Sequence, residues 1–181
     1  MIVTQTNLAG CFIIEPTVFN DLRGSFFESF HKMEFAEKTG LEIEFVQDNQ
    51  SISQKGTLRG LHLQENEFAQ AKLVRVISGK VLDVVVDLRK ESQTFGNSFS
   101  MILSGENNKQ LFVPRGFAHG FYVLEDETVF NYKCDNYYYK AAQKGIRYND
   151  SDLAIDWCLD GKEVILSEKD KHLMTFKQFC Q

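Results

Sequence analysis

A histidine among cationic and amide side chains is the feature of this chain most suited to chemistry. Between Asn49 and Lys72 the sequence reads NQSISQKGTLRGLHLQENEFAQAK, which places His62 close to Arg59 inside a strand-like run. Imidazole accepts a proton near neutral pH. Arg59 and Lys72 would hold an anionic substrate and stabilise negative charge that develops beside such a base. The alternative interpretation is a strand that packs its histidine and leaves both cations in solvent.

The spacing of Arg59 and His62 predicts an irregular strand. Residues three apart in a regular strand point to opposite faces, so these two cannot both line one pocket. Gly60 lies between them, and glycine inside a strand commonly marks a bulge that shifts the alternation. If both side chains serve one site, we expect an irregularity near Gly60. Lys72 begins the next apolar strand, where a solvated strand end is the alternative.

A second histidine follows a turn motif. Residues 114–121 read PRGFAHGF, a Pro-x-Gly-x-x-His element that resembles the second sequence motif of cupins, which are small jelly rolls with a ligand-binding interior. The proline and glycine would set the turn, so that His119 returns on a strand that points into the barrel. A β-turn with an incidental histidine is the alternative interpretation.

The histidines form a poor set of metal ligands. Metal-binding cupins generally offer a His-x-His pair followed by a glutamate in their first motif, where this chain has only His62. His31 and His172 lie near the termini in charged, helix-like segments. Two histidines without a nearby carboxylate do not make a three-ligand site. The sequence therefore predicts no metal, and a metal-dependent cupin oxygenase is the less favoured possibility.

Tyrosines and a late carboxylate complete the set of candidates. Tyr132 lies in an alternating strand, where it either packs in the core or donates a proton. The run Tyr137–Tyr139 either stacks on a base or forms a surface cluster. Ser167 and Asp170 match the N-terminal capping pattern of a helix. Alternatively, Asp170 reaches His62 and orients its imidazole, as a carboxylate does in catalytic dyads.

Composition bounds the fold and the partners. The chain has 181 residues, 43% of them hydrophobic and 25% charged, with a net charge of −5. These values predict a single domain over residues 1–181 and argue against a nucleic-acid partner. No apolar run approaches the ~20 residues of a membrane span, and the N-terminus lacks a secretory signal pattern. Four dispersed cysteines are typical of free thiols. We therefore expect a cytoplasmic protein with no membrane association.

Short alternating segments separated by turns dominate the chain. We expect one all-β domain, an antiparallel jelly-roll barrel with short peripheral helices. Helices are predicted over Lys32–Thr39, closed by Gly40, and after Ser167. The predicted strands are Gly10–Pro16, Ser25–Phe30, Phe45–Ser53, Gly56–Gln64, Ala71–Ser78, Lys80–Leu88, Ser98–Leu103, Gln110–Val113, Ala118–Val123, Thr128–Cys134 and Gly145–Tyr148.

Eight segments in order resemble a known enzyme family. They are DLRGSFFE (21–28), QDN (47–49), LRGLHLQ (58–64), AQAKLV (69–74), DVVVDLR (83–89), PRGFAHGF (114–121), YKC (132–134) and SEKD (167–170). Together they are similar to the dTDP-4-dehydrorhamnose 3,5-epimerase family of sugar-nucleotide epimerases. The resemblance covers nearly the whole chain. It implies a metal-free cupin jelly roll that forms a homodimer and uses no cofactor.

The resemblance also assigns roles to residues. His62 resembles the proton acceptor, Asp170 its carboxylate partner and Tyr132 the proton donor, while Lys72 matches a lysine near the substrate ketone. Tyr138 matches the aromatic side chain that stacks on thymine. In the family, the segment with Arg23 and Glu28 reaches into the site of the partner subunit. The full set of matching substrate-binding positions is Arg23, Glu28, Gln47, Asp48, Asn49, Arg59, Lys72, His119, Tyr138, Gln143 and Lys169.

The implied activity is inversion of C3 and C5 of dTDP-4-dehydro-6-deoxy-D-glucose, which gives dTDP-4-dehydro-L-rhamnose. The C4 ketone acidifies both positions, so one base and one acid suffice. An epimerase for C3 or C5 alone and a non-catalytic sugar-nucleotide-binding cupin are the alternatives. The chain departs from the family pattern at Gln143, where a glutamate is typical, at Leu63, where an aromatic residue is common, and in the tail Lys171–Gln181, which lacks a usual proline.

Overall fold

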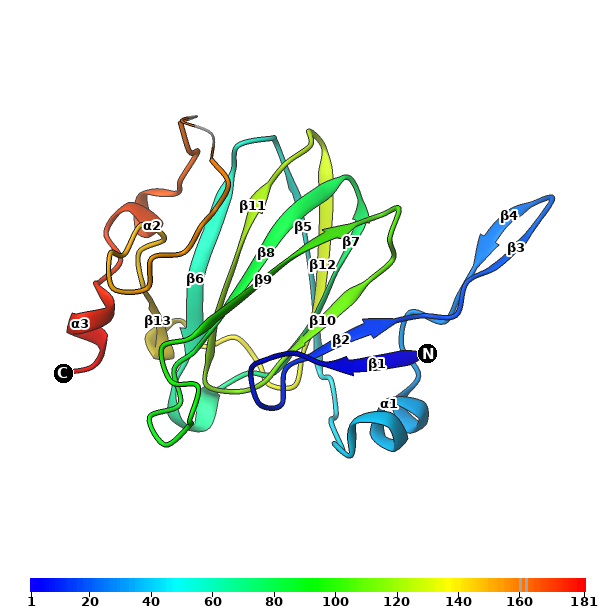
Figure 1. Cartoon of the computed structure of the whole chain (residues 1–181), viewed down its shortest axis with the longest axis horizontal. Coiled ribbons are helices and arrows are strands. Elements are labelled where there is room, and N and C mark those ends of the chain that lie inside the picture. Colours follow the sequence, from blue (N-terminus) through cyan, green and yellow to red (C-terminus); the bar gives the residue numbers. More distant parts are fainter. Residues whose placement is uncertain (160, 162) are drawn as a thin grey trace.

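Two antiparallel sheets face each other in a computed structural model that describes residues 1–159, 161 and 163–181 (Figure 1). One sheet has six strands in the order β1 (Ile2–Gln5), β2 (Phe12–Glu15), β10 (Gln110–Val113), β7 (Lys72–Ser78), β12 (Thr128–Cys134) and β5 (Gln47–Ser53). The other has five in the order β13 (Gln143–Gly145), β6 (Leu58–Gln64), β11 (Phe117–Val123), β8 (Lys80–Asp87) and β9 (Ser98–Ser104). The predicted all-β, antiparallel architecture is confirmed.

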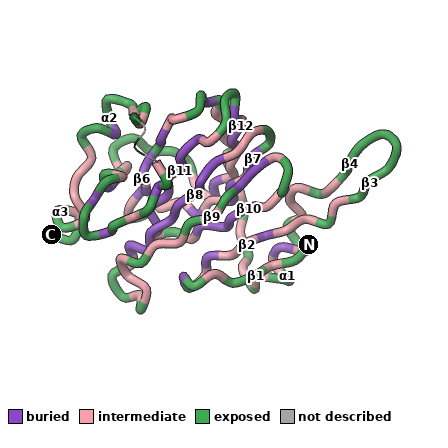
Figure 2. Tube along the Cα trace, turned by 45° about the horizontal axis from the view of Figure 1, so that its top comes forward, coloured by how far each residue is buried: buried purple, intermediate pink, exposed green. Residues whose placement is uncertain are grey.

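Strand alternation divides the core into an inner and an outer layer. On β8, Val81 and Val85 face the interior between the two sheets, whereas Leu82 and Val84 face outward. The outward layer of the five-stranded sheet is covered by the C-terminal part of the chain, including the buried Trp157. Figure 2 shows the resulting concentration of buried backbone on the central strands of both sheets. The space between the sheets is therefore the place where a side chain from each sheet can meet.

Short helices lie at the periphery. Helix α1 (Lys32–Thr39) begins where the His31 side chain accepts a hydrogen bond from the Glu34 backbone N–H at 3.2 Å. It ends at Gly40, whose φ of 72° is the left-handed conformation that glycine adopts easily. Helices α2 (Glu168–Lys171) and α3 (Phe176–Phe179) and the 3-10 turns η1 (Asn66–Phe68) and η2 (Lys140–Ala142) complete the set. No helix in the described ranges is long and apolar enough to span a membrane.

The strand predictions differ from the structure mainly at the sheet edges. The structure adds β1 at the edge of the six-stranded sheet, and it moves the last predicted strand from Gly145–Tyr148 to β13. The predicted strand Ser25–Phe30 is shorter and belongs to a separate hairpin, β3 (Phe19–Asp21) with β4 (Gly24–Phe26). These segments are short, and an edge strand pairs on one side only. Their hydrophobic alternation is consequently weak.

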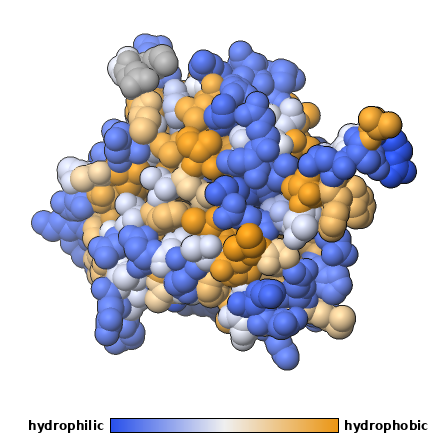
Figure 3. Space-filling model, turned by 45° about the vertical axis from the view of Figure 1, so that its right-hand side comes forward, coloured by the Kyte–Doolittle hydropathy of each residue, from blue (hydrophilic) through white to orange (hydrophobic). Residues whose placement is uncertain are grey.

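The β3–β4 hairpin forms an arm that projects from the sandwich (Figure 1). All six of its strand residues are exposed. They include the apolar side chains of Phe19 and Phe26, and Leu22 at the turn is fully exposed as well. Figure 3 shows the arm standing away from the body with apolar atoms at its tip. These apolar side chains do not contribute to the core of their own chain. Exposed apolar side chains of this kind are typical of surfaces that contact another protein.

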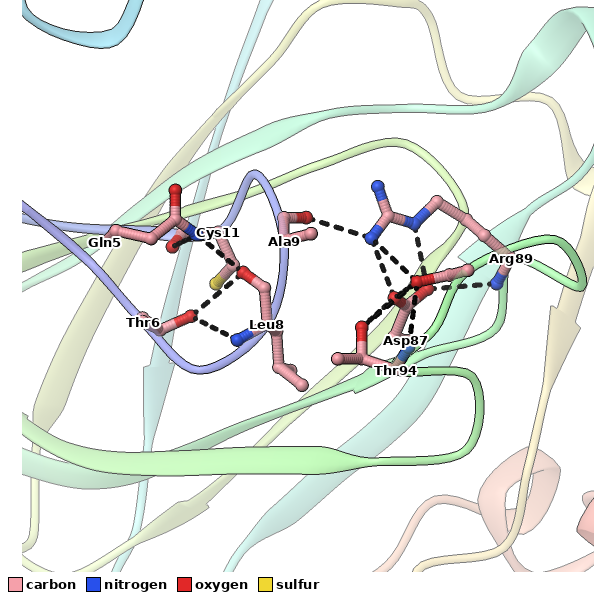
Figure 4. Close-up of polar contacts among 9 residues, drawn as sticks. Gln5, Thr6, Leu8, Ala9, Cys11, Asp87, Arg89 and Thr94 are labelled. Carbon is pink, nitrogen blue, oxygen red and sulfur yellow. Dashed lines mark hydrogen bonds and ion pairs between the residues drawn. The ribbon is translucent and has the colours of Figure 1, made fainter.

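A polar network ties the N-terminal hairpin to the loop after β8 (Figure 4). Asp87, at the end of β8, accepts hydrogen bonds from Arg89 Nε at 2.8 Å, Ser92 Oγ at 2.6 Å and Thr94 Oγ1 at 2.7 Å. Arg89 Nη2 in turn donates to the Ala9 carbonyl oxygen at 2.9 Å. Burial would raise the pKa of Asp87, but these hydrogen bonds outweigh it and hold the pKa well below its ordinary value. The carboxylate is therefore fully engaged in holding the two loops together.

Candidate active site

Most of the predicted site residues meet in a recess between the two sheets. We call it the inter-sheet recess. It has a larger lobe of about 650 Å³ and a smaller lobe of about 200 Å³, and Asn49, His62, Lys72 and Tyr132 line both. The larger lobe is also lined by Gln50, Ser51, Thr57, Leu58, Arg59, His119, Phe121, Ile165, Leu166, Ser167, Lys169 and Asp170. The smaller is also lined by Gln47, Leu63, Gln64, Gln70, Tyr138 and Gln143.

His62 and Asp170 form a hydrogen-bonded dyad at this recess. The His62 Nε2 atom lies 2.6 Å from Asp170 Oδ1, although the two residues are 108 positions apart in the chain. Burial alone would raise the pKa of Asp170, but hydrogen bonds from His62, Ser167 and the Gly60 backbone outweigh it, and the pKa lies below its ordinary value. An ionised carboxylate only accepts hydrogen bonds, so His62 Nε2 carries the proton and Nδ1 holds the free lone pair. That nitrogen is the one equipped to remove a proton.

Both proposed interpretations of the SEKD segment hold at once. Ser167 caps helix α2, because its hydroxyl accepts the Asp170 backbone N–H at 3.1 Å. The Asp170 carboxylate is nevertheless directed to His62. The short helix therefore fixes the backbone of the residue whose side chain fixes the imidazole.

Strand β6 is irregular at Gly60, as the spacing of Arg59 and His62 predicted. His62 pairs with His119 on β11, while Arg59 pairs with Phe121, so three steps on β6 match two steps on β11. This register shift is a β-bulge, and it directs Arg59 and His62 to the same recess. Leu58 and Leu61, their preceding neighbours, both pack in the outer core layer. A cis peptide bond follows Gly60.

Tyr132 and Lys72 approach the recess from the opposite sheet. Lys72 lies at the start of β7 and Tyr132 on the neighbouring β12, with the Lys72 Nζ atom 5.9 Å from the centroid of the Tyr132 ring. Burial raises the pKa of the Tyr132 phenol, which keeps it protonated at neutral pH. Burial also lowers the pKa of Lys72, against the opposing effects of Cys134 and Asp83. A base and a proton donor thus face one cavity from different sheets.

The other polar side chains form two groups along the recess. Arg59 donates from Nε and Nη2 to Ser53 Oγ at 3.2 and 3.1 Å. At the smaller lobe, the Gln143 Oε1 atom accepts hydrogen bonds from the Lys169 ammonium and, at 2.8 Å, from the Tyr138 hydroxyl. Arg59 and Lys169 both line the larger lobe. Their positive charges suit it to an anionic ligand.

Gln47 and Asn49 also line the recess, joined by a 3.0 Å hydrogen bond from Gln47 Nε2 to Asn49 Oδ1. The structure does not bring three other predicted residues there. Asp48 lies on the other face of β5, where its carboxylate pairs with Lys133 Nζ at 3.0 Å. Arg23 belongs to the turn of the arm, and Glu28 follows the arm; neither lines the recess of its own chain.

The structure adds residues that the sequence interpretation did not name. Ser51 and Ser53 follow Asn49 along the inward face of β5, and Ser53 positions Arg59. Asp83 is completely buried on β8 and pairs with His119. A signal for Asp83 exists in the sequence, because it interrupts the apolar run of residues 81–86 at a position that faces inward.

Another recess of about 760 Å³ lies beside the network of Asp87 and Arg89. Among the described residues that line it, Arg89 is already hydrogen-bonded to Asp87 and Glu91 is the one acidic side chain, with no histidine, tyrosine or lysine to act beside it. Within residues 1–159, 161 and 163–181, no three His, Cys, Asp or Glu side chains gather at distances that suit a metal ion. The inter-sheet recess is therefore the candidate active site.

Comparison with known proteins shows which family the chain resembles. The family model described as dTDP-4-dehydrorhamnose 3,5-epimerase matches residues 5–178. The chain belongs to this epimerase family. A curated relative of the same name from Methanothermobacter thermautotrophicus is 50% identical over 169 residues, which cover 93% of this chain and 90% of the relative.

Solved structures of the epimerase family share the fold. The dTDP-4-dehydrorhamnose 3,5-epimerase from Elizabethkingia anophelis NUHP1 superposes with a TM-score of 0.95 at 54% identity, covering 98% of this chain and 97% of that one. The 3,5-epimerase from Legionella pneumophila Philadelphia 1, solved in complex with dTDP-4-keto-L-rhamnose, has a TM-score of 0.93 at 48% identity, with coverages of 97% and 93%. The fold is thus the cupin-like jelly roll that the resemblance implied.

Proposed function

We propose that this protein is an epimerase that converts dTDP-4-dehydro-6-deoxy-D-glucose to dTDP-4-dehydro-L-rhamnose by inverting C3 and C5. The observation that carries the proposal is the placement of His62 and Tyr132 on opposite sheets of one recess. Inversion requires that a proton leave one face of the sugar and that another arrive on the opposite face. A base and an acid on opposite walls meet this requirement.

The reaction follows from the states of the side chains. His62 Nδ1 removes the proton next to the C4 ketone, and the electron pair of the broken C–H bond moves to the ketone oxygen to give an enolate. The Lys72 ammonium, which lines both lobes of the recess, stabilises that oxyanion. The Tyr132 phenol then returns a proton to the other face of the same carbon, and the enolate collapses to the ketone. Solvent restores the protonation of both groups, and the sequence repeats at the second carbon.

The polar groups at the ends of the recess suit a nucleotide sugar. Arg59 and Lys169 would bind the two phosphates, since both cations line the larger lobe. Tyr138 borders the smaller lobe, where its ring offers a stacking surface to thymine. The relative from Legionella pneumophila, which was solved with dTDP-4-keto-L-rhamnose, supports this substrate class. Gln143 accepts from both Lys169 and Tyr138 and so couples the phosphate and base ends.

The proposal includes a homodimer in which the arm completes the site of the partner. The arm extends away from its own sandwich, and Arg23 and Glu28 lie outside their own recess. In a dimer, Arg23 would add a third cation near the phosphates. A cytoplasmic location is part of the same proposal, because nucleotide-sugar substrates are made from cytoplasmic nucleotides.

Incubation with dTDP-4-dehydro-6-deoxy-D-glucose in deuterated water tests the proposed function. We expect NMR of the product to show deuterium at both C3 and C5 together with the L-rhamno configuration. Deuterium at C3 alone, or at C5 alone, would contradict the proposal and show that the protein is an epimerase for a single carbon. Binding without any exchange would replace it by a sugar-nucleotide-binding protein.

Substitution of His62 tests the assignment of the base. His62→Ala removes the only atom proposed to abstract the proton, and we expect turnover to fall by about 10³-fold or more. Binding of dTDP, measured by calorimetry, should change little, because phosphate and base contacts involve other residues. An active His62→Ala enzyme would contradict the proposal.

A further inference from the structure

Asp83 is an ionisable side chain placed where apolar residues are expected. It lies in the middle of β8, has no exposed surface, and is directed to the interior between Val81 and Val85, which belong to the inner core layer. A carboxyl group in such surroundings loses its hydration, which is a large penalty unless partners replace it. A valine would satisfy the packing of this strand. The carboxyl group therefore calls for an explanation outside core packing.

One oxygen of Asp83 is used by a residue of the recess. The Asp83 Oδ2 atom lies 2.8 Å from Nε2 of His119, which lines the larger lobe. The contact leaves Nδ1 of His119 as the ring nitrogen available to a ligand, and it fixes the orientation of the ring. The arrangement repeats the His62–Asp170 dyad on the neighbouring strand, because His119 is the register partner of His62.

The other oxygen of Asp83 is unsatisfied. Among the described residues, Asp83 Oδ1 is one of two buried side-chain atoms without a hydrogen-bond partner, and the other, Ser51 Oγ, belongs to a residue that lines the same recess. Lys72 is the second residue of the recess that Asp83 affects. Asp83 contacts His119, which lines the same lobe as Lys72. Burial raises the pKa of Asp83, opposed by His119 and then Lys72. Burial lowers the pKa of Lys72, opposed by Cys134 and then Asp83. The backbone of Lys72 pairs with β10 and β12, but within the described chain its side chain makes no hydrogen bond or ion pair, and its ammonium lies 5.9 Å from the centroid of the Tyr132 ring.

We propose that Asp83 is a positioning residue of the epimerase: it orients His119 and keeps Lys72 in its charged form, so that Lys72 can stabilise the enolate. The inference rests on the proposed function of the recess. It explains why β8 carries a buried carboxyl group that faces inward beside His119. Asp83 does not line the recess and acts through His119 and Lys72 alone.

The effect of Asp83 on Lys72 has a definite sign. Burial lowers the pKa of Lys72 and raises that of Asp83, and each charge opposes the shift of the other. Three further groups face Lys72: Cys134 and Tyr132 on β12, and His62 on β6. Burial raises the pKa of the Cys134 thiol to about 11 and raises that of Tyr132 as well, so both stay neutral near pH 8. The proposal requires Asp83 to be ionised, a state that burial opposes and that His119 and Lys72 favour; removing this charge lowers the pKa of Lys72 further.

Asp83→Asn is the direct test, because it keeps the shape and an acceptor for His119 but removes the charge. We expect kcat at pH 8 to fall by about tenfold to a hundredfold, with KM within about threefold of the wild type. The alkaline limb of the kcat–pH profile should move down by about one pH unit. Thermal stability should be unchanged or higher, because a buried charge has been removed.

Asp87→Asn is the matched control. Asp87 lies on the same strand, faces the same way and is equally buried, but it pairs with Arg89 away from the recess. We expect this variant to lose stability while it keeps the wild-type kcat–pH profile. Asp83→Leu is a second variant that fills the apolar site without a polar atom. It should fold and lose at least as much kcat as Asp83→Asn, because it removes both the charge and the hydrogen-bond partner of His119.

A measurement without substrate separates this proposal from the proposed function. Lysine side chains labelled with ¹³C at Cε report the titration of Lys72, identified by its loss in Lys72→Met. The proposal expects Lys72 to titrate at lower pH in Asp83→Asn than in the wild type, whether or not the protein epimerises the proposed sugar. An unchanged Lys72 titration would overturn it. So would a wild-type kcat–pH profile in Asp83→Asn, or a loss of stability like that of Asp87→Asn with no shift of the alkaline limb.

Discussion

At the scale of single residues, the recess holds two groups whose surroundings assign them opposite tasks. Asp170 stays ionised and fixes His62 with its proton on Nε2, which leaves a basic nitrogen for the substrate. Burial raises the pKa of Tyr132, which keeps its phenol as a proton donor. Pairs of titratable groups that are driven in opposite directions are typical of acid–base catalysis. The direction of proton transfer, from substrate to His62 and from Tyr132 to substrate, follows from these states.

Tyr132→Phe separates the two proton transfers. The variant keeps the ring near Lys72 but lacks the phenol, so His62 should still remove the proton and return it to the same face. In deuterated water we expect substrate that gains deuterium with its configuration retained, while epimer formation falls by about 10²- to 10⁴-fold. NMR of the recovered sugar nucleotide measures both quantities.

The control for this prediction is the double variant His62→Ala/Tyr132→Phe, in which exchange should disappear as well. Epimer formation by Tyr132→Phe at the wild-type rate would show that another group supplies the proton. Loss of exchange in the single variant would mean that the phenol takes part in proton removal itself.

Much of the site could be predicted from the sequence at this scale, but only for residues whose side chains themselves suggest a chemical role. His62, Lys72, Tyr132 and Asp170 were identified from side chains that transfer protons or stabilise charge, and they meet in one recess. Asp48 was included as part of the matching segment QDN (47–49), yet alternation along β5 turns it to the other face. The role proposed for Asp83, which lies outside the recess, depends on which strands pack together, and a local sequence pattern does not show this.

At the scale of elements, two glycines allow β6 and β11 to approach closely at the bulge. A Cβ atom on Gly60 would lie 2.6 Å from the Cα atom of Gly120 and 2.7 Å from the His119 carbonyl oxygen. Gly60 also has a φ of 117°, a conformation that other residues rarely adopt. Its backbone N–H supports the Asp170 carboxylate. The bulge therefore serves the dyad and the placement of Arg59 together.

Gly60→Ala should lower the free energy of unfolding by roughly 3 kcal/mol and lower kcat by more than tenfold, because the added methyl group meets backbone that cannot move aside. Chemical denaturation and steady-state kinetics provide the two measurements. Gly24→Ala is the matched control, since Gly24 also has a positive φ but a Cβ there would meet no atom within 4 Å. Equal losses of stability in the two variants would show that conformation, and not the close approach, determines the requirement for glycine at position 60.

Element predictions succeeded where signals at both ends agreed. Helix α1 was predicted with its observed bounds because Gly40 closes it, and β10 and β12 were predicted with theirs because turns flank both strands. The bulge at Gly60 was also predicted, because two functional residues required the same face. Strand β1 and helix α3 were missed. Each is four residues long: β1 depends on pairing with β2, whereas α3 begins at a capping box of Thr175 and Gln178, a local signal that the sequence interpretation did not use.

At the scale of the whole molecule, the arm is the element that a single chain does not explain. Its strands pair only with each other, and its apolar side chains are exposed. At its base, Arg75 of β7 lies over the ring of Phe27, 5.7 Å from the ring centroid, so the arm leaves the sandwich beside the six-stranded sheet. In a dimer with two-fold symmetry, the arm of each subunit would lie against the six-stranded sheet of its partner. In the proposed dimer, each site then combines His62 of one subunit with Arg23 of the other.

Mixing two inactive variants tests this shared site. His62→Ala lacks the base, and Arg23→Ala lacks the cation of the arm, so each homodimer should have low activity. If the arm acts in the partner, a mixed dimer contains one site in which both residues are intact, since the Arg23→Ala subunit supplies His62 and the His62→Ala subunit supplies Arg23. After subunit exchange at equal concentrations, half of the dimers are mixed and half of their sites are intact, so activity should rise to about one quarter of the wild-type value per site. If Arg23 acted within its own chain, every site in the mixture would lack one residue, and activity would stay at the level of the separate variants.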